Sequence, residues 1–178
     1  ILELILNWII DDIPTSPIKS LVQGATQESL IIDNQVKTQP ENPFLTLLMK
    51  TDNCTSLQDS FLQFTESHPI TGGYQTNDGR RVDASCQAKI TKYPAYLIIP
   101  LHRWESNNGG TMGPKLVQWF EFPLILQLEH NYELVTVVLH EGQTEDGHYT
   151  TITRDMNDEW YFCNDESVCL FDISDLPM

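Results

Sequence analysis

Basic side chains are scarce in this chain of 178 residues. Ten lysines and arginines stand against 25 aspartates and glutamates, which gives a formal net charge of −15 at pH 7. Nucleic-acid binding is driven by clustered lysine and arginine, so this charge argues against a nucleic-acid partner. An acidic surface favours a basic protein partner instead.

Cysteines and long apolar runs are also scarce. The four cysteines are Cys54, Cys86, Cys163 and Cys169. They are too few and too scattered for a disulfide scaffold, and we therefore expect reduced thiols in a cytoplasmic or nuclear protein. The apolar run ILELILNWII is too short to span a membrane and lacks the basic leader of a signal peptide. Its spacing predicts a helix with a buried face over residues 1–11, and we expect no membrane partner.

Short elements fill the first hundred residues. Residues 18–43 predict short strands and loops, and FLTLLMK, residues 44–50, predicts a strand. The apolar run of residues 96–101 predicts a strand that is buried on both faces. Asp78-Gly79 has the composition of a hairpin tip.

One amphipathic helix is predicted in the segment SLQDSFLQFTES. Leu57, Phe61 and Phe64 recur there at helical spacing, and Ser56 is a suitable N-cap. Beyond it, the composition of residues 105–114 predicts a flexible loop. Six closely spaced strand candidates follow, namely KLVQWFEF, LILQLEHN, YELVTVVLHEG, HYTTITR, EWYFCND and VCLFDI. Such spacing favours an antiparallel sheet over repeated strand-helix-strand units.

The stretch GHYTTITRDMNDEWYFCND holds the clearest candidate for chemistry. A turn separates His148 from Asn164, so the two side chains can meet across a hairpin. In a nucleophilic triad, a histidine serves as the base and a second residue, such as an amide, orients it. A surface histidine at the end of a strand is the alternative for a GHY motif alone.

Five blocks in order carry a resemblance to a known family. They are SLQDSFLQF, YPAYLIIPLHRW, KLVQWFEFPLILQL, NYELVTVVLHEGQTEDGHYTTI and EWYFCNDESV. Together they resemble the second half of a ubiquitin-specific protease, over about residues 21–168. The resemblance implies an α+β fold of the papain-like cysteine peptidase type, mostly antiparallel sheet with a few helices. It corresponds to the fingers and palm of the hand-like domain.

The resemblance also implies roles for individual residues. His148 corresponds to the catalytic base, Asn164 to the residue that orients it, and Asp165 to a second acidic position that helps to polarise the site. Gly142, Gly147 and Tyr149 correspond to residues beside the C-terminal tail of bound ubiquitin. Two loops, residues 105–114 and 141–147, would cover that tail, with ordinary hairpin loops as the alternative.

The chain departs from the family pattern in two places. It has no box of the kind that carries the nucleophilic cysteine, and Cys54 lacks the sequence context of one. It also lacks the last palm strand, so residues 1–178 are expected to form a single partial catalytic domain. We therefore expect the isolated chain to be inactive.

No cofactor is implied by the resemblance. Many family members bind zinc through two pairs of cysteines at the fingertips, but Thr76 and Gly79 stand where the second pair would fall. We therefore expect no structural metal. The remaining metal candidate has the ligands His140, His148, Cys163 and Cys169. Their spacing matches no usual zinc site.

Three hypotheses follow for function. The first is a deubiquitinase acting on ubiquitinated proteins, in which this chain supplies the base and the orienting residue. The second is an inactive ubiquitin-binding pseudo-protease or scaffold. The third is a hydrolase that acts on another ubiquitin-like modifier.

Overall fold

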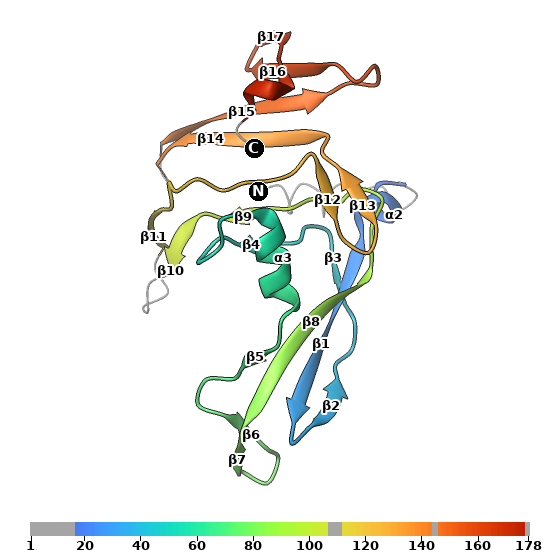
Figure 1. Ribbon diagram of the computed structural model, residues 1–178, viewed down its shortest axis with the longest axis vertical. Helices are drawn as coiled ribbons and strands as arrows, with labels where there is room; N and C mark the ends of the chain where they lie inside the picture. The colour runs from blue at the N-terminus through green and yellow to red at the C-terminus, as the bar shows by residue number, and fades with distance from the viewer. Residues whose placement is uncertain (1–16, 107–111, 144–145, 177–178) are drawn as a thin grey trace. The chain divides into compact units, whose positions relative to one another are not determined.

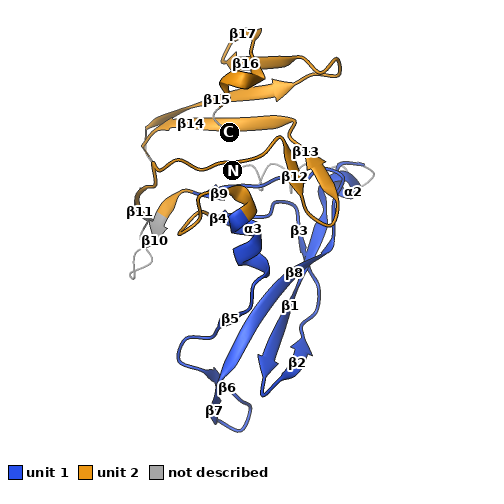
Figure 2. Ribbon diagram, viewed as in Figure 1, with its two compact units in different colours: residues 1–50, 59–102 blue, residues 51–58, 103–178 orange. Residues whose placement is uncertain are grey.

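The computed structural model describes residues 17–106, 112–143 and 146–176 (Figure 1). The chain divides into two compact units, one of Ile1–Lys50 with Asp59–His102 and one of Thr51–Gln58 with Arg103–Met178 (Figure 2). The expected helix over residues 1–11 lies outside the described residues. No helix in the described ranges is long and apolar enough to cross a membrane.

The first unit contains most of the α-helical residues that the structure describes. Its elements are α2 (Ile18–Val22), β1 (Gly24–Ile32), β2 (Gln35–Thr38), β3 (Asn42–Phe44), β4 (Met49–Lys50), β5 (His68–Pro69), β6 (Tyr74–Gln75), β7 (Arg81–Val82), β8 (Ala84–Lys92) and β9 (Leu101–His102). Helix α3 (Leu57–Thr65) begins in the second unit and continues into the first. It begins directly after Ser56 and buries Leu57 and Phe61, which confirms the predicted amphipathic helix.

Two long antiparallel strands, β1 and β8, form the centre of the first sheet (Figure 1). Its strand order is β2-β1-β8-β5, and β3 also pairs with β1. Asp33 and Asn34 close the β1–β2 hairpin with φ values of 49° and 62°, which is the left-handed conformation that these residue types tolerate. The prediction of short strands over residues 18–43 is therefore wrong for β1, which runs for nine residues.

The predicted hairpin at Asp78-Gly79 is confirmed. Gly79 has a φ of 85° at the turn between β6 and β7, a value that suits glycine. The Asp78 carboxylate accepts hydrogen bonds from the Thr76 hydroxyl and from Arg80 Nε, the latter at 2.8 Å. Thr76 is thus part of a hydrogen-bonded turn.

Two strand predictions in this unit are wrong. Residues 96–101 form no regular strand before Leu101, and residues 44–50 are extended in a strand only at their two ends. The two segments are nevertheless hydrogen-bonded to each other: Leu47 N donates to Ile98 O and Met49 N donates to Pro100 O, both at 2.9 Å. Proline has no N–H to donate, so the ladder shrinks to the short parallel pair β4–β9.

Among the described residues of the second unit, the regular structure is mostly β-strand. Its elements are β10 (Trp104–Ser106), β11 (Met112–Lys115), β12 (Ile125–Gln127), β13 (Asn131–Glu133), β14 (Thr136–Gly142), β15 (Gly147–Arg154), β16 (Trp160–Asn164), β17 (Ser167–Leu170) and the 3-10 helix η1 (Ile173–Asp175). Strands β14 to β17 form an antiparallel sheet in chain order, as the sequence predicts.

Of the predicted strand over residues 115–122, only Lys115, at the end of β11, and an isolated bridge at Glu121 have strand pairing. The Arg103 guanidinium donates to Leu116 O at 2.9 Å and to Gln118 O at 2.7 Å. These bonds supply hydrogen-bond donors to carbonyls that have no strand partner in this segment. In the predicted loop of residues 105–114, the flanks pair as β10 and β11, and residues 107–111 lie outside the described residues.

The β14–β17 sheet has one buried and one exposed face. Ile152 is 2% exposed, and Thr150 on the same face of β15 is also buried. Val138 and Val168 belong to the opposite face and are more than half exposed. His148 is two residues from Thr150, so it extends from the buried face at the end of the strand.

We expect Ile152→Ala to lower the free energy of unfolding by about 2–5 kcal/mol, because it leaves a cavity under β15. Val138→Ala, on the exposed face of the adjacent strand, is the matched control and should cost less than about 0.5 kcal/mol. Urea unfolding followed by tryptophan fluorescence measures both. Equal losses would show that the two faces are not distinguished by burial.

Candidate functional site

Strand pairing brings His148 and Asn164 together. Thr151 pairs with Cys163 across β15 and β16, and both candidate residues lie just beyond that pair on the opposite face. Side chains diagonal to one another across an antiparallel pair are within reach when one of them is long. Asn164 is the last residue of β16 and His148 the second residue of β15, so the pair sits at one end of the sheet.

A short hydrogen bond joins the two side chains. His148 Nε2 lies 2.6 Å from Asn164 Oδ1. An amide oxygen only accepts, so Nε2 donates and carries the imidazole proton in the neutral ring. Nδ1, which then holds the lone pair, has no hydrogen-bond partner among the residues that the structure describes. The ring is 47% exposed, so that lone pair can accept a proton.

Asp165 adds a negative charge beside this pair. Its Oδ2 lies 4.0 Å from His148 Nε2, and its side chain is 79% exposed. Asp165 and Glu166 form the two-residue loop between β16 and β17, where Asp165 has a φ of 50°. The distance is too long for a hydrogen bond but suits a weak attraction to a protonated imidazole.

The turn between β14 and β15 requires glycine at both ends. Gly142 pairs with Gly147, and Gln143 N donates to Asp146 O at 3.0 Å. Gly142 has a φ of 95°, and a Cβ there would lie 2.5 Å from Asp146 O. A Cβ on Gly147 would overlap the imidazole of His140. The turn beside His148 is therefore so tightly packed that only glycine fits at these two positions.

Sequence reasoning missed Lys115, which contacts one of its candidates, His140, on the other face of the same hairpin. Lys115 Nζ lies 2.7 Å from His140 O, 3.1 Å from His140 Nδ1 and 3.2 Å from Gly142 O. The rings of His140 and Tyr149 face each other with centroids 4.5 Å apart. The sequence signal for Lys115 was only that it begins one of the family-like blocks.

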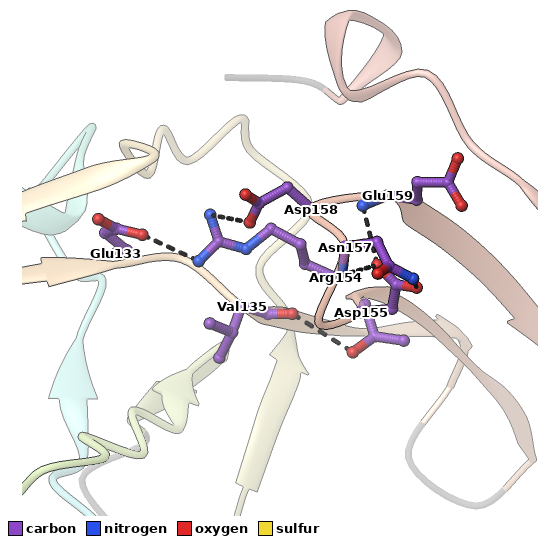
Figure 3. Close-up of polar contacts among 8 residues, drawn as sticks. Glu133, Val135, Arg154, Asp155, Asn157, Asp158 and Glu159 are labelled. Atoms are coloured by element: carbon purple, nitrogen blue, oxygen red, sulfur yellow. Dashed lines mark hydrogen bonds and ion pairs between the residues drawn. The ribbon is translucent and has the colours of Figure 1, made fainter.

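The turn between β15 and β16 keeps these strands in register. Figure 3 shows the Asp155 carboxylate accepting from the backbone N–H groups of Asn157 and Glu159, at 2.8 and 2.9 Å. These bonds lower the pKa of Asp155, the Glu159 N–H having the largest effect. Arg154 makes ion pairs with Glu133 and Asp158 at the same end of the sheet.

The alternative metal site from the sequence is not assembled. All four cysteines are free. His140 and Cys163 belong to one face of the β14–β17 sheet, whereas His148 and Cys169 belong to the other. Side chains on opposite faces of a sheet cannot converge on one ion at bonding distance.

Residues 2–176 match the family model described as ubiquitin carboxyl-terminal hydrolase. Among curated proteins, ubiquitin carboxyl-terminal hydrolase 22 of Mus musculus is 28% identical over 142 residues, 78% of this chain and 26% of its own length. Ubiquitin carboxyl-terminal hydrolase 24 of Arabidopsis thaliana is 30% identical over 131 residues, 66% of this chain and 23% of its own. The chain thus spans about a quarter of the length of these relatives.

Solved structures share the fold. The chain superposes on a subunit of the Ubp8-Sgf11-Sgf73-Sus1 SAGA DUB module with a TM-score of 0.83 at 22% identity, covering 99% of this chain and 44% of that one. The same module bound to ubiquitin aldehyde gives a TM-score of 0.81 at 22% identity, with 96% and 45% covered. These neighbours confirm the predicted α+β papain-like fold.

We expect neutral His148 to carry its proton on Nε2, because Asn164 Oδ1 can only accept. Long-range proton–nitrogen NMR spectra of the imidazole distinguish the two tautomers. Asn164→Ala should yield a mixture of tautomers. Asp165→Asn, which changes a group 4.0 Å away, is the control and should leave the tautomer unchanged. A wild-type ring protonated on Nδ1 would contradict this geometry.

Proposed function

Because the chain belongs to the ubiquitin carboxyl-terminal hydrolase family, we propose that it supplies the base and the orienting residue of a thiol-dependent deubiquitinase. The observation that carries this proposal is the 2.6 Å hydrogen bond between His148 Nε2 and Asn164 Oδ1. It leaves Nδ1 as the nitrogen that can accept a proton from a thiol. The reaction is hydrolysis of the peptide or isopeptide bond after the C-terminal glycine of ubiquitin.

In this reaction His148 transfers a proton in each of two steps, first from the thiol to the amine and later from water to the departing thiolate. Its Nδ1 takes the proton of the thiol, and the resulting thiolate attacks the carbonyl carbon of the terminal glycine. The imidazolium then gives that proton to the departing amine as the amide bond breaks, which leaves a thioester. Water, deprotonated by the same imidazole, hydrolyses the thioester and restores the thiol.

Asn164 and Asp165 have different supporting roles. Asn164 keeps the ring in one tautomer and orientation without adding a charge. Asp165 favours the imidazolium that forms during the reaction, weakly because both groups are exposed to solvent. Both roles act through His148.

The thiol is proposed to come from a segment of the longer protein rather than from these 178 residues. Cys54 is 6% exposed in a turn. Cys163 lies on the face opposite His148. Burial and the nearby Glu28 carboxylate raise the pKa of Cys86, which reduces the thiolate that attack requires. Cys169 lies on the strand beyond Asn164, where its thiol donates to Phe162 O.

Ubiquitin is the proposed partner, and its C-terminal tail the segment that reaches the site. Gly142 and Gly147 form the tight turn beside His148, and we propose that the tail, which ends in two glycines, passes along this turn. Tyr149 is 65% exposed beside them and can flank the tail. The net charge of −15 complements a basic partner surface.

Two of the structural neighbours are modules bound to ubiquitin aldehyde and to monoubiquitin. A cytoplasmic or nuclear location is proposed with this function.

An inactive ubiquitin-binding scaffold is the second candidate. The chain holds no family-type cysteine box, and a palm that binds ubiquitin without a thiol would act in this way. The retained His148–Asn164 bond favours the enzyme, because a scaffold has no use for a fixed imidazole tautomer.

We expect His148→Ala to lower kcat/KM about 10²- to 10⁴-fold in the full-length protein that contains this chain. The substrate is ubiquitin bearing a C-terminal fluorogenic amide. His130→Ala, which changes an exposed histidine in the turn between β12 and β13, is the matched control and should retain activity. A wild-type protein that binds ubiquitin but does not cleave the substrate would favour the scaffold.

A further inference from the structure

We propose that Lys115 is a positioning residue for the ubiquitin tail, acting through His140 on Tyr149 and on the turn from Gly142 to Gly147. This inference rests on the proposed ubiquitin binding. Lys115 belongs to β11 and its partners to β14 and β15, all within the second unit (Figure 2).

The Lys115 ammonium has three acceptors on the last residues of β14. They are His140 O at 2.7 Å, His140 Nδ1 at 3.1 Å and Gly142 O at 3.2 Å. Strand β14 is at the edge of its sheet, so the outward carbonyls of residues 140 and 142 have no neighbouring strand in that sheet. An ammonium has three N–H donors, which matches the three acceptors. Lys115 thus holds the end of the strand that enters the turn.

The same contact fixes the ring of His140. Because the ammonium can only donate, His140 Nδ1 accepts and the ring proton lies on Nε2. The ring then occupies the space beside Gly147 that a Cβ would fill. Its other contact is the ring of Tyr149, at 4.5 Å between centroids and 33° between planes. Lys115 therefore reaches Tyr149 through one intermediate side chain.

The register between β14 and β15 places the contacts of Lys115 next to the candidate site. His140 pairs with Tyr149, Glu141 with His148, and Gly142 with Gly147. Tyr149 and His148 are consecutive, so their side chains lie on opposite faces of β15. Lys115 cannot contact His148 from the face that carries Tyr149. Its effect should therefore be on binding of the tail rather than on proton transfer.

The test is titration of the full-length protein with two probes, intact ubiquitin and ubiquitin that lacks its two C-terminal glycines. Lys115→Met should weaken binding of intact ubiquitin about fivefold, as expected for the loss of a hydrogen-bonded anchor. Binding of the truncated form should not change. In the hydrolysis assay, KM should rise while kcat per active site stays within about twofold.

Two further variants separate positioning from stability. His140→Ala should have the same selective effect, and the double variant should be no weaker than His140→Ala alone, since Lys115 acts through His140. Arg154→Met is the matched control, because it removes a cation with two ion pairs at the other end of β15 and should leave both affinities unchanged.

Equal weakening for both probes, or additive effects of Lys115→Met and His140→Ala, would overturn the positioning role. No binding of ubiquitin by the wild-type protein would overturn it as well. A wild-type protein that binds ubiquitin without hydrolysing it contradicts only the enzyme function, and the titrations still decide the role of Lys115.

Discussion

The register between β15 and β16 is the constraint on which the candidate site depends. A shift by one residue would turn one of the two strands over and place His148 and Asn164 on opposite faces. The buried side of the sheet opposes such a shift, because Ile152 and Thr150 would have to exchange places with exposed neighbours. The Asp155 turn, with its three accepted hydrogen bonds, resists it from the closed end of the hairpin.

The two faces of this hairpin have different tasks in our account. The face of Ile152 carries His148 and Asn164, so the packing of the buried residues on that face helps to position these two side chains. The opposite face carries His140 and Tyr149, which Lys115 ties to β11. Gly142 and Gly147 flank the turn that connects β14 to β15. The chemistry and the handling of the tail are thus separated by a single strand, and a substitution can affect one without the other.

Much of the second unit could be predicted from the sequence, whereas several strands of the first could not. HYTTITR and EWYFCND are rich in β-branched and aromatic residues between clear turns, and both become strands. The β8 segment, ASCQAKITK, mixes small, polar and charged residues, so its hydrophobic pattern is too weak to reveal a nine-residue strand. Residues 96–101 are strongly apolar, but the neighbouring prolines limit their pairing.

At the site, the meeting of His148 with Asn164 followed from a hairpin and a family-like motif, while their catalytic roles stay predictions. The Lys115–His140 contact could not be foreseen, because its partners are 25 residues apart on strands of different sheets. No periodicity within one segment encodes such a contact. The same holds for Arg103, whose side chain binds the carbonyls of residues 116 and 118 where the sequence predicts a strand.

The most direct test of the central claim is to map the covalent adduct that the full-length protein forms with a ubiquitin probe bearing a thiol-reactive C-terminus. Peptide mass spectrometry identifies the modified cysteine. We predict an adduct on a cysteine outside these 178 residues, formed much more slowly by the His148→Ala variant. An adduct on Cys54, Cys86, Cys163 or Cys169, or bound ubiquitin with no adduct at all, would contradict it.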